Sequence, residues 1–392
     1  MRRISHMRTL PGKQGFTLIE MLVAVTVLVI LLGILFSITS TVAKTVTNTS
    51  VKVDTFAAAR SAFDLMSQKL SQATLNTYWD YNNPVTPTTY YRQSDLQFYV
   101  RPNVQKAGYG QEVYFVTPST YSTRTSLRST DGLLNACGFY VSYGPDTTFR
   151  PGTLTGTSRY RYRLMQGLEP TENLAVYSNW TATPTTTFST GTAAAAATWV
   201  TANTTAWNNY WTSMTTIWNT HAWITNTIGN TGSTPNVNVT PLVNNVIALI
   251  VWPRLSDTDD PPILNGTPDG GKLTSTYTYD SQGAEATLAS GGVQPITSNQ
   301  LPPTVQVTMI AISESSASRL NLTATQPTVI DNILSGASLT PSTPAPFTIS
   351  TYTQYQADLA RVSAALAANH IGFEILNTSV TMKESKWSDN SQ

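Results

Sequence analysis

The most constraining feature of this 392-residue sequence is an almost wholly apolar run from Phe16 to Ile38, which contains a single charged residue, Glu20. An α-helix of 23 residues is about 35 Å long, which is enough to cross a bilayer. The residues before this run carry four basic side chains and no acidic one. We therefore expect a single-pass membrane helix with a cytoplasmic N-terminus and with the rest of the chain on the other side.

Glu20 and the sharp border between Gly15 and Phe16 separate three interpretations of this segment. A secretory signal peptide would need a shorter apolar run and a small-residue cleavage site, for which Thr-Val-Ala at residues 41–43 is a candidate. A plain membrane anchor would explain the length but not the carboxylate, because a charge inside a bilayer is costly without a partner. A processed N-terminal signal accounts for both features, and the residues at the border favour it.

The hexapeptide Gly15-Phe16-Thr17-Leu18-Ile19-Glu20 resembles the class III signal of type IV pilins and pseudopilins. In that family a prepilin peptidase cuts after the glycine and methylates the new amine. The resemblance implies that residues 1–15 are a leader peptide and that N-methylated Phe16 begins the mature chain. It implies three partners, namely the peptidase, other pilin-like subunits and an inner-membrane assembly platform. It also implies a bacterial inner-membrane protein whose C-terminal domain is periplasmic, or extracellular in the assembled filament.

Glu20 has a physical role in this interpretation. Cleavage would create a cation at Phe16, and in a stack of helices Glu20 of one chain can meet that amine on a neighbour. Each charge is costly alone in apolar surroundings, so pairing them would fix the axial register of the subunits. The alternative is that the carboxylate reaches the lipid headgroups, because Glu20 lies only four residues after Phe16.

The helical pattern continues beyond the apolar run, and Asn82-Asn83-Pro84 stops it. Apolar residues recur there at spacings of three, four or seven and form one stripe. The stripe comprises Val42, Val46, Val53, Phe56, Phe63, Met66, Leu70 and Ala73. We predict one helix of about 95 Å, with residues 16–38 in the membrane and residues 39–78, to about Tyr78, in the periplasm.

Residues 84–392 are predicted to form a pilin-like, β-rich globular domain. Eight runs have strand composition, namely Leu96–Val100, Glu112–Val116, Ala136–Tyr143, Tyr160–Leu164, Leu174–Tyr177, Asn244–Trp252, Thr304–Ile312 and Phe373–Met382. Residues 246–251 are continuously apolar, as in a central strand, whereas residues 304–309 alternate, as in a strand with one buried and one wet face. A short helix is predicted at Gln356–Asn369. The long helix packed on an antiparallel sheet gives an α+β fold class.

Residues 179–236 form a Thr/Trp-rich insertion that interrupts the strand pattern and holds six of the nine tryptophans. Several of these tryptophans, Trp223 among them, recur near helical spacing. Trp207, Trp211 and Trp218 could form an exposed contact surface for a partner, a substrate or a polysaccharide. The alternative, which we favour, is that the tryptophans of the insertion pack onto the sheet.

Composition excludes several function classes. Charged residues make up 11% of the chain and its net charge is +1, which argues against nucleic-acid binding. We expect no enzymatic activity, because the sequence has neither a Gly-rich phosphate loop after a strand nor a Gly-x-Ser-x-Gly elbow. The one cysteine, Cys137, lies in a strand-like run, so we expect a buried thiol.

No cofactor is expected, and calcium is the one metal for which the sequence offers ligands. Asp257, Asp259 and Asp260 supply carboxylates of the kind that Ca²⁺ prefers. Their spacing matches no defined calcium loop, and two prolines follow them. A solvated turn is therefore the favoured interpretation of this cluster.

Several short segments resemble particular families within the pilin-like class. Residues Gln300–Met309 are similar to the late strand of J-type minor pseudopilins. Arg161–Met165, Val251–Ser256, Tyr279–Ser281 and Lys386–Ser388 look like protein C of the Verru_Chthon cassette, a pseudopilin-like family. This implies a minor pseudopilin-like subunit at or near the tip of a type II secretion or type IV pilus-like filament. Two alternatives stay open, a minor type IV pilin that acts as an adhesin and a membrane-tethered binding domain that never polymerises.

Overall fold

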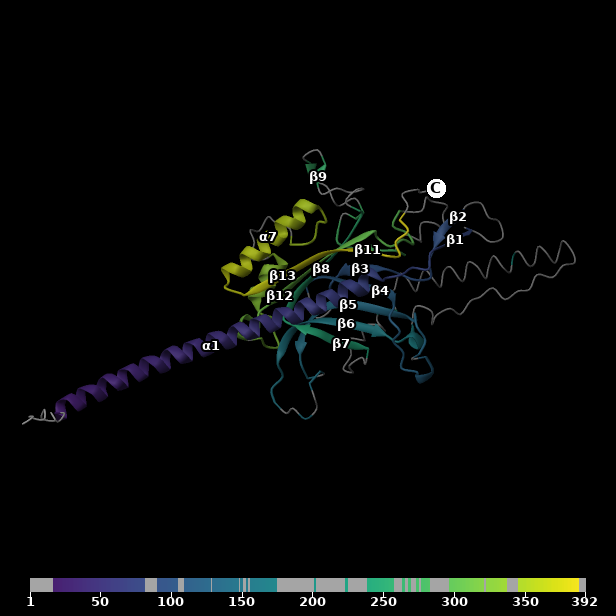
Figure 1. Cartoon of the computed structure of the whole chain (residues 1–392). Helices are drawn as coiled ribbons and strands as arrows, with labels where there is room; N and C mark the ends of the chain where they lie inside the picture. The colour runs from purple at the N-terminus through teal and green to yellow at the C-terminus, as the bar shows by residue number, and fades with distance from the viewer. Residues whose placement is uncertain are drawn as a thin grey trace, which may run out of the picture. The chain divides into compact units, whose positions relative to one another are not determined.

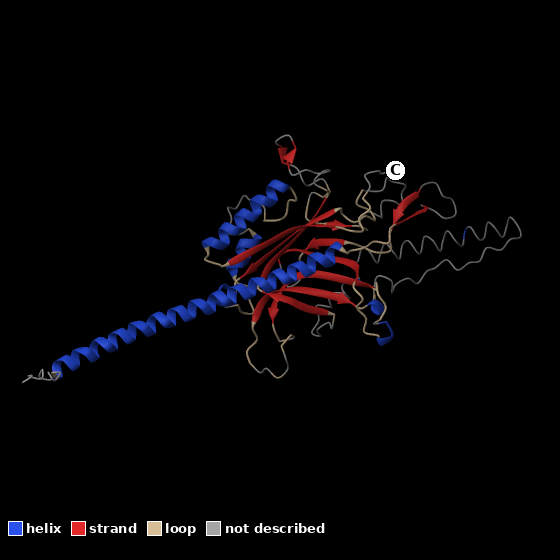
Figure 2. Ribbon diagram, in the orientation of Figure 1, coloured by secondary structure: helices blue, strands red, loops and turns tan. Residues whose placement is uncertain are grey.

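The computed structural model has an α+β fold, as predicted, and divides into two units, Met1–Val53 and Asp54–Gln392. It describes residues 17–81, 90–104, 109–127, 129–147, 149–150, 153, 156–174, 201, 223–224, 238–256, 263–264, 267–268, 273–274, 276–282, 296–320, 322–336 and 345–387. Figure 1 shows the elements along the chain, and Figure 2 shows their secondary structure.

The first helix, α1 (Leu18–Ser71), is continuous over 54 residues. Within the first unit all of its described side chains are exposed, including the whole apolar run from Leu18 to Ile38. Within the second unit one face of the helix is buried, and its residues recur at the spacing of a helical face. They are Ala59, Ala62, Phe63, Met66 and Leu70. Val42, Val46 and Val53 of the predicted stripe are exposed, so the stripe that packs is shorter than predicted.

Helix α1 ends seven residues before the predicted end at Tyr78, which is a correction to the sequence prediction. The backbone N–H of Thr74 donates to the carbonyl of Val116 at 2.9 Å and forms an isolated antiparallel bridge with it. The backbone N–H groups of Gln72 and Ala73 donate only three residues back, to Lys69 and Leu70, so the helical ladder has already ended where Thr74 turns to the strand. Tyr78 instead begins strand β1 (Tyr78–Tyr81), which pairs with β2 (Tyr90–Gln93).

In the described part of the domain, nine strands form one sheet whose main path runs β13-β12-β8-β4-β5-β6-β7, with β3 on β4 and β11 on β3. Its strands are β3 (Tyr99–Pro102), β4 (Tyr109–Pro118), β5 (Leu134–Pro145), β6 (Tyr160–Glu169), β7 (Val239–Asn244), β8 (Val246–Arg254), β11 (Tyr279–Asp280), β12 (Thr304–Ile312) and β13 (Phe373–Thr381). A separate small pair joins β9 (Ile263–Leu264) to β10 (Thr267–Pro268). Of the predicted strands, Leu174–Tyr177 is largely outside the described residues, and Leu174 itself follows the 3-10 turn Thr171–Asn173.

The predicted antiparallel pairing is confirmed for every described strand pair except β4 with β8, which is parallel. That pairing is two residues long and joins Tyr109 to Ala248 and Gly110 to Leu249. Gly110 has φ of +87°, and a Cβ at this position would lie 1.9 Å from the Leu249 carbonyl oxygen. A residue with a side chain therefore cannot occupy this junction without displacing the backbone.

Both faces of the sheet are covered. The buried face of α1 joins one core with residues such as Phe115, Val251 and Val307. The opposite core contains residues from three helices, α5 (Glu314–Arg319), α6 (Thr328–Ser335) and α7 (Tyr352–Ala368). Strand β8 is buried along its whole length, which confirms the central strand predicted from its apolar run.

Strand β12 has the predicted bounds but not the predicted wet face. Burial alternates from Thr304 to Val307, and every residue from Thr308 onward is buried. Helix α7 causes this difference, because the Tyr355 hydroxyl lies 2.5 Å from the Thr308 hydroxyl and covers the second face. The same helix starts four residues before the predicted Gln356, since the Thr351 side chain accepts the backbone N–H of Gln354 and caps it there.

Candidate functional site

The N-terminal signal falls partly within the described residues, which include Thr17 and Glu20 but not Gly15 or Phe16. The backbone N–H and the hydroxyl of Thr17 each donate to Glu20 Oε2 at 2.9 Å. The backbone N–H of Glu20 donates in return to Thr17 Oγ1 at 3.4 Å. This reciprocal pair is a capping box, which satisfies donors that the first turn of a helix leaves without intrahelical partners.

The capping box leaves part of the Glu20 carboxylate accessible. The side chain is exposed, and Oε1 has no hydrogen-bond partner among the residues that the structure describes. One oxygen can thus hold the start of its own helix while the other faces outward. Pairing with the Phe16 amine of a neighbouring chain stays a prediction, and this geometry leaves an acceptor for it.

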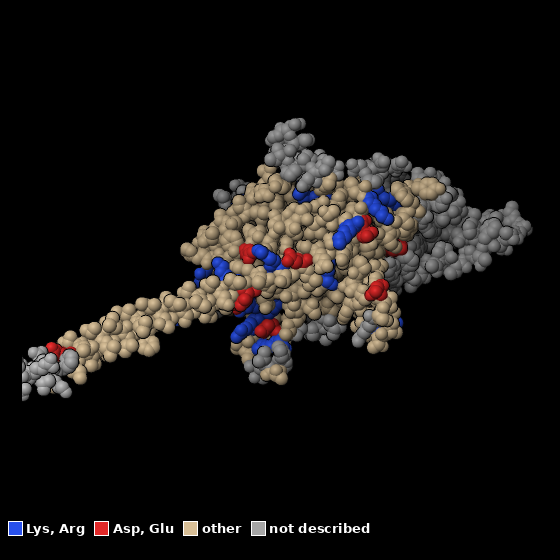
Figure 3. Space-filling model, viewed as in Figure 1, with Lys and Arg blue, Asp and Glu red and all other residues tan. Residues whose placement is uncertain are grey.

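The apolar part of α1 is long and apolar enough to cross a membrane, by length and composition. Its most apolar 18-residue window has a mean hydropathy of 3.0, and none of that window is buried. Between Glu20 and Lys44 the helix carries no charged side chain, as Figure 3 shows by its uninterrupted tan surface. A helix that is apolar on all sides requires lipid or other helices around it rather than water. This segment is therefore compatible with a single-pass membrane anchor.

The Trp-rich insertion is described at one informative point, Trp223, whereas Trp207, Trp211 and Trp218 lie outside the described residues. Trp223 is 1% exposed. Its indole Nε1–H donates to Gln97 Oε1 at 2.8 Å, and its ring meets Tyr114 edge-on with centroids 6.4 Å apart. This tryptophan therefore belongs to the domain core. The exposed contact surface proposed for the other three stays a prediction.

The sequence also pointed to an acidic cluster and to a buried cysteine. Asp257, Asp259 and Asp260 lie outside the described residues, so the favoured solvated turn and the alternative of calcium binding both stay predictions. Cys137 is fully buried in β5, as predicted, and burial raises the pKa of its thiol to about 11. Because the thiolate is the reactive form, this cysteine is chemically quiet at neutral pH.

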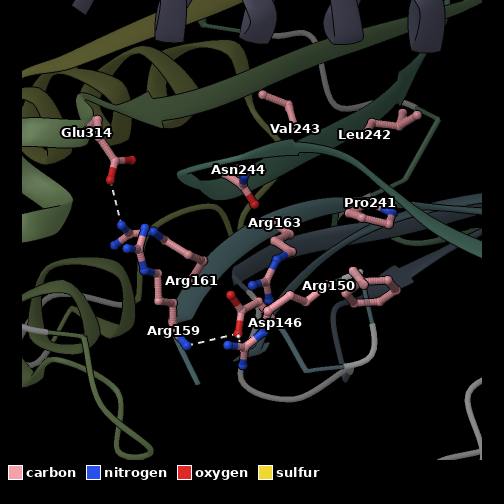
Figure 4. A pocket seen from close by; sticks show the side chains of 11 residues that line it. Asp146, Arg150, Arg159, Arg161, Arg163, Pro241, Leu242, Val243, Asn244 and Glu314 are labelled. Atoms are coloured by element: carbon pink, nitrogen blue, oxygen red, sulfur yellow. Dashed lines mark hydrogen bonds and ion pairs between the residues drawn. The ribbon is translucent and has the colours of Figure 1, made fainter. Parts of the chain in front are cut away.

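Sequence reasoning missed a cavity of about 390 Å³ beside β6 and β7, shown in Figure 4. Four arginines line it, namely Arg150, Arg159, Arg161 and Arg163. The signal was visible in the predicted strand at Tyr160–Leu164, where arginine and tyrosine alternate. Side chains two residues apart point to the same face of a strand, so alternation places Arg161 and Arg163 together.

Two carboxylates accompany these arginines. Glu314 Oε1 lies 2.5 Å from a terminal nitrogen of Arg161, and its Oε2 accepts the side-chain amide of Asn245 at 2.6 Å. Asp146 Oδ1 accepts the backbone N–H of Arg159 at 2.9 Å and lies 3.3 Å from the guanidinium of Arg150. The backbone bond and the neighbouring arginines lower the pKa of Asp146, so it stays ionised.

Arg163 is the most buried of the four cations, with 5% of its surface exposed. One terminal nitrogen donates to the carbonyls of Gly144 at 2.8 Å and Pro145 at 3.2 Å. The guanidinium lies 5.8 Å from the centre of the Phe149 ring, within the range of a cation–π contact. These bonds hold the head group at the wall of the cavity.

Comparison with known proteins bears on the N-terminal segment. A family model described as the prokaryotic N-terminal methylation motif matches residues 10–36. No curated protein and no solved structure matches the chain. The matched range spans Gly15, Phe16 and Glu20 and continues through most of the apolar run. The chain therefore carries the class III signal of type IV pilin-like proteins, which implies processing by a prepilin peptidase and assembly with other pilin-like subunits.

Proposed function

We propose that this protein is a minor pseudopilin-like subunit that assembles at or near the tip of a type II secretion or type IV pilus-like filament. The observation that carries the proposal is a methylation motif that runs directly into a helix apolar on all sides. Such a helix suits a bilayer before assembly and a bundle of similar helices afterwards. The large domain of residues 54–392 fits an end of a filament better than a tightly packed shaft.

The narrower parts of the proposal rest on resemblance and on composition. We propose a J-like position because residues Gln300–Met309 are similar to the late strand of J-type minor pseudopilins. We also propose that the chain is related to protein C of the Verru_Chthon cassette. The role would be structural rather than enzymatic, as part of a protein-transport machine that contacts an inner-membrane assembly platform. The N-terminus would be cytoplasmic before cleavage, with the β-rich domain on the far side of the inner membrane.

Processing is tested by mass spectrometry of the purified full-length protein. The expected mature chain begins with N-methylated Phe16. Gly15→Leu should block cleavage, because a branched side chain hinders close approach of the backbone to the peptidase. Gly33→Ala is a matched control, since a Cβ at Gly33 has nothing within 4 Å. An intact Met1 in the wild type, or a cut after Ala43, would contradict the proposal.

Assembly is tested by cross-linking to neighbouring pilin-like subunits in cells, with two variants that separate the roles of Glu20. Glu20→Gln keeps a residue that can complete a capping box but removes the charge, whereas Glu20→Ala removes both. If the charge registers the subunits, both variants lose the cross-links while Asp54→Ala, an exposed acid later in the same helix, keeps them. Wild-type levels of cross-links in Glu20→Ala would contradict the role of this residue in registering the subunits.

A further inference from the structure

The arginine-lined cavity concentrates positive charge in a chain that is otherwise nearly neutral. Among the residues that the structure describes, four of the 23 basic residues of the chain lie around it with two carboxylates, an excess of two positive charges. Both carboxylates are already engaged, Glu314 by Arg161 and Asn245, and Asp146 by Arg150 and the backbone of Arg159.

Arg159 and Arg163 are the two cations without a carboxylate partner in the part of the chain that the structure describes. The Arg159 side chain is exposed at the mouth of the cavity, whereas Arg163 is buried in its wall. Burial lowers the pKa of Arg163, Asp146 opposes this effect and Arg161 adds to it. A buried guanidinium with so little negative charge around it favours an anion in the cavity.

The chemistry of the residues that line the cavity indicates which kind of anion it binds. All four cations are arginines, whose planar fork matches a carboxylate with two parallel hydrogen bonds. Phe149, Leu242 and Val243 add an apolar wall, which suits the aliphatic neighbours of an acidic side chain. Among the described strands β7 is the last of the main sheet path, and an extended peptide can lie along such an edge. A volume of about 390 Å³ accommodates a ligand group of this size.

We propose that this cavity binds a carboxylate-bearing peptide segment of a partner protein, with Arg159 and Arg163 as the residues that meet the carboxylate. This binding site belongs to the globular domain and is independent of the N-terminal signal. Its failure would leave processing and filament assembly unaffected, so the two proposals are tested separately.

The test is fluorescence anisotropy with the full chain in a non-ionic detergent. The probe is a fluorescein-labelled hexapeptide of alternating glutamate and valine, and the same peptide with glutamine in place of glutamate is its control. We expect saturable binding of the glutamate peptide only, weakening as salt screens the charges. Arg159→Gln should weaken binding about tenfold, the effect of losing one charge-assisted hydrogen bond.

Arg124→Gln is the matched control, because Arg124 is exposed and does not line the cavity. Arg163→Gln should abolish binding, and its circular dichroism spectrum decides whether that loss reflects unfolding, in which case Arg159→Gln alone judges the proposal. Equal affinities for Arg159→Gln and Arg124→Gln would overturn the proposal, as would no binding to the wild type. Stronger competition by inorganic phosphate or by polygalacturonate than by unlabelled glutamate peptide would overturn the peptide assignment.

Discussion

The two halves of α1 have the same secondary structure and opposite surroundings. Residues 18–53 are largely apolar, and every described side chain among them is exposed. Residues 54–71 alternate between a buried face, which includes Phe63 and Met66, and an exposed face, which includes Arg60 and Asp64. The first half is apolar on all sides, so lipid or other helices must surround it. The second half has one apolar face, which packs on the β-sheet of the domain.

The position along α1 at which the apolar stripe becomes buried differs from the position that the sequence pattern predicts. Val46 and Val53 continue the apolar stripe of the second half, yet they are 62% and 61% exposed. Phe56 is the first residue of the stripe that packs against the core. Periodicity therefore marks a face that can be buried, and only the extent of the sheet decides how much of that face is buried.

The largest effect is expected from shortening the chain across this boundary. Chains that begin at Thr41 and at Asp54 should melt at the same temperature, because the described side chains between these two starts are exposed. A chain that begins at Asp64 should fail to fold, since it loses Phe56 and Phe63. Removing one buried phenylalanine side chain costs about 3–5 kcal/mol, a large part of a typical folding free energy. Circular dichroism during heating measures the difference, and equal melting of all three chains would contradict the assigned boundary.

One leucine substitution in each half of α1 tests the same difference in burial. Leu70 is fully buried and Leu28 is 55% exposed. Leu70→Ala should lower the free energy of unfolding by about 2–5 kcal/mol. Leu28→Ala should change it by less than about 0.5 kcal/mol, as exposed substitutions usually do. Urea unfolding of the full chain in detergent checks both values, and comparable losses in the two variants would show that the first half also packs on the domain.

The Cys137 thiol reports on the core beneath the second half of the helix, since it belongs to the same core as Met66 and Leu70. Burial raises its pKa from the ordinary 9.0 to about 11, so the folded chain holds this proton more tightly than the unfolded chain. The resulting stabilisation is fully present below pH 9 and is lost as pH rises to 11. The loss should be on the order of 2–3 kcal/mol.

Chemical denaturation at pH 8.5 and at pH 11 measures this effect, and Cys137→Ala provides the control. The buried tyrosines also destabilise the fold at high pH, so the prediction concerns the difference between the two chains. The wild type should lose more stability over this interval than Cys137→Ala. Identical losses, or rapid alkylation of Cys137 at neutral pH, would show that the helix does not seal this core.

The smallest effect concerns the first turn of the exposed half. Thr17→Ala removes a capping side chain and should cost about 1 kcal/mol, confined to the start of the helix. Hydrogen exchange should therefore accelerate at residues 18–21 while the melting temperature of the domain stays unchanged. Thr26→Ala is the control, because the Thr26 hydroxyl donates within the helix to the Val23 carbonyl and caps nothing. Equal exchange in the two variants would argue against the capping box.

Local sequence pattern predicted the helices and strands of this chain better than the contacts between them. The bounds of β12 match the predicted run, in which residues 304–309 alternate, whereas β6 was predicted to end at Leu164 and continues to Glu169. Gln166 and Glu169 are polar and favour a loop by composition, yet pairing with β5 buries both. Burial of a polar side chain depends on a neighbouring strand, which single-sequence pattern does not supply.

The alternation that places Arg161 and Arg163 together was visible in the sequence, but the rest of the cavity was not, for a similar reason. Its arginines come from β6 and the loop before it, its apolar wall from β7 and from Phe149 of that loop, and Glu314 from the start of α5. These segments are separated by up to about 170 residues of sequence and meet only through strand order. By contrast, the class III signal lies in consecutive residues, so the sequence alone identifies it. Gly15, Phe16 and Glu20 needed no knowledge of the fold.

The parallel pairing of β4 with β8 has a consequence for the cooperativity of unfolding. Strands β3 to β7 come from residues 99–244, whereas β8, β12 and β13 come from residues 246–381. Each group is held together by long antiparallel ladders, but the ladder between the groups is only two residues long. Contacts between residues so distant in sequence form late in folding, after the entropy of closing the loop has been overcome. The main-chain pairing between the two groups therefore depends on a junction that only a glycine at position 110 can fit, whereas the core shared by α1, Phe115 and Val251 joins the groups through side chains.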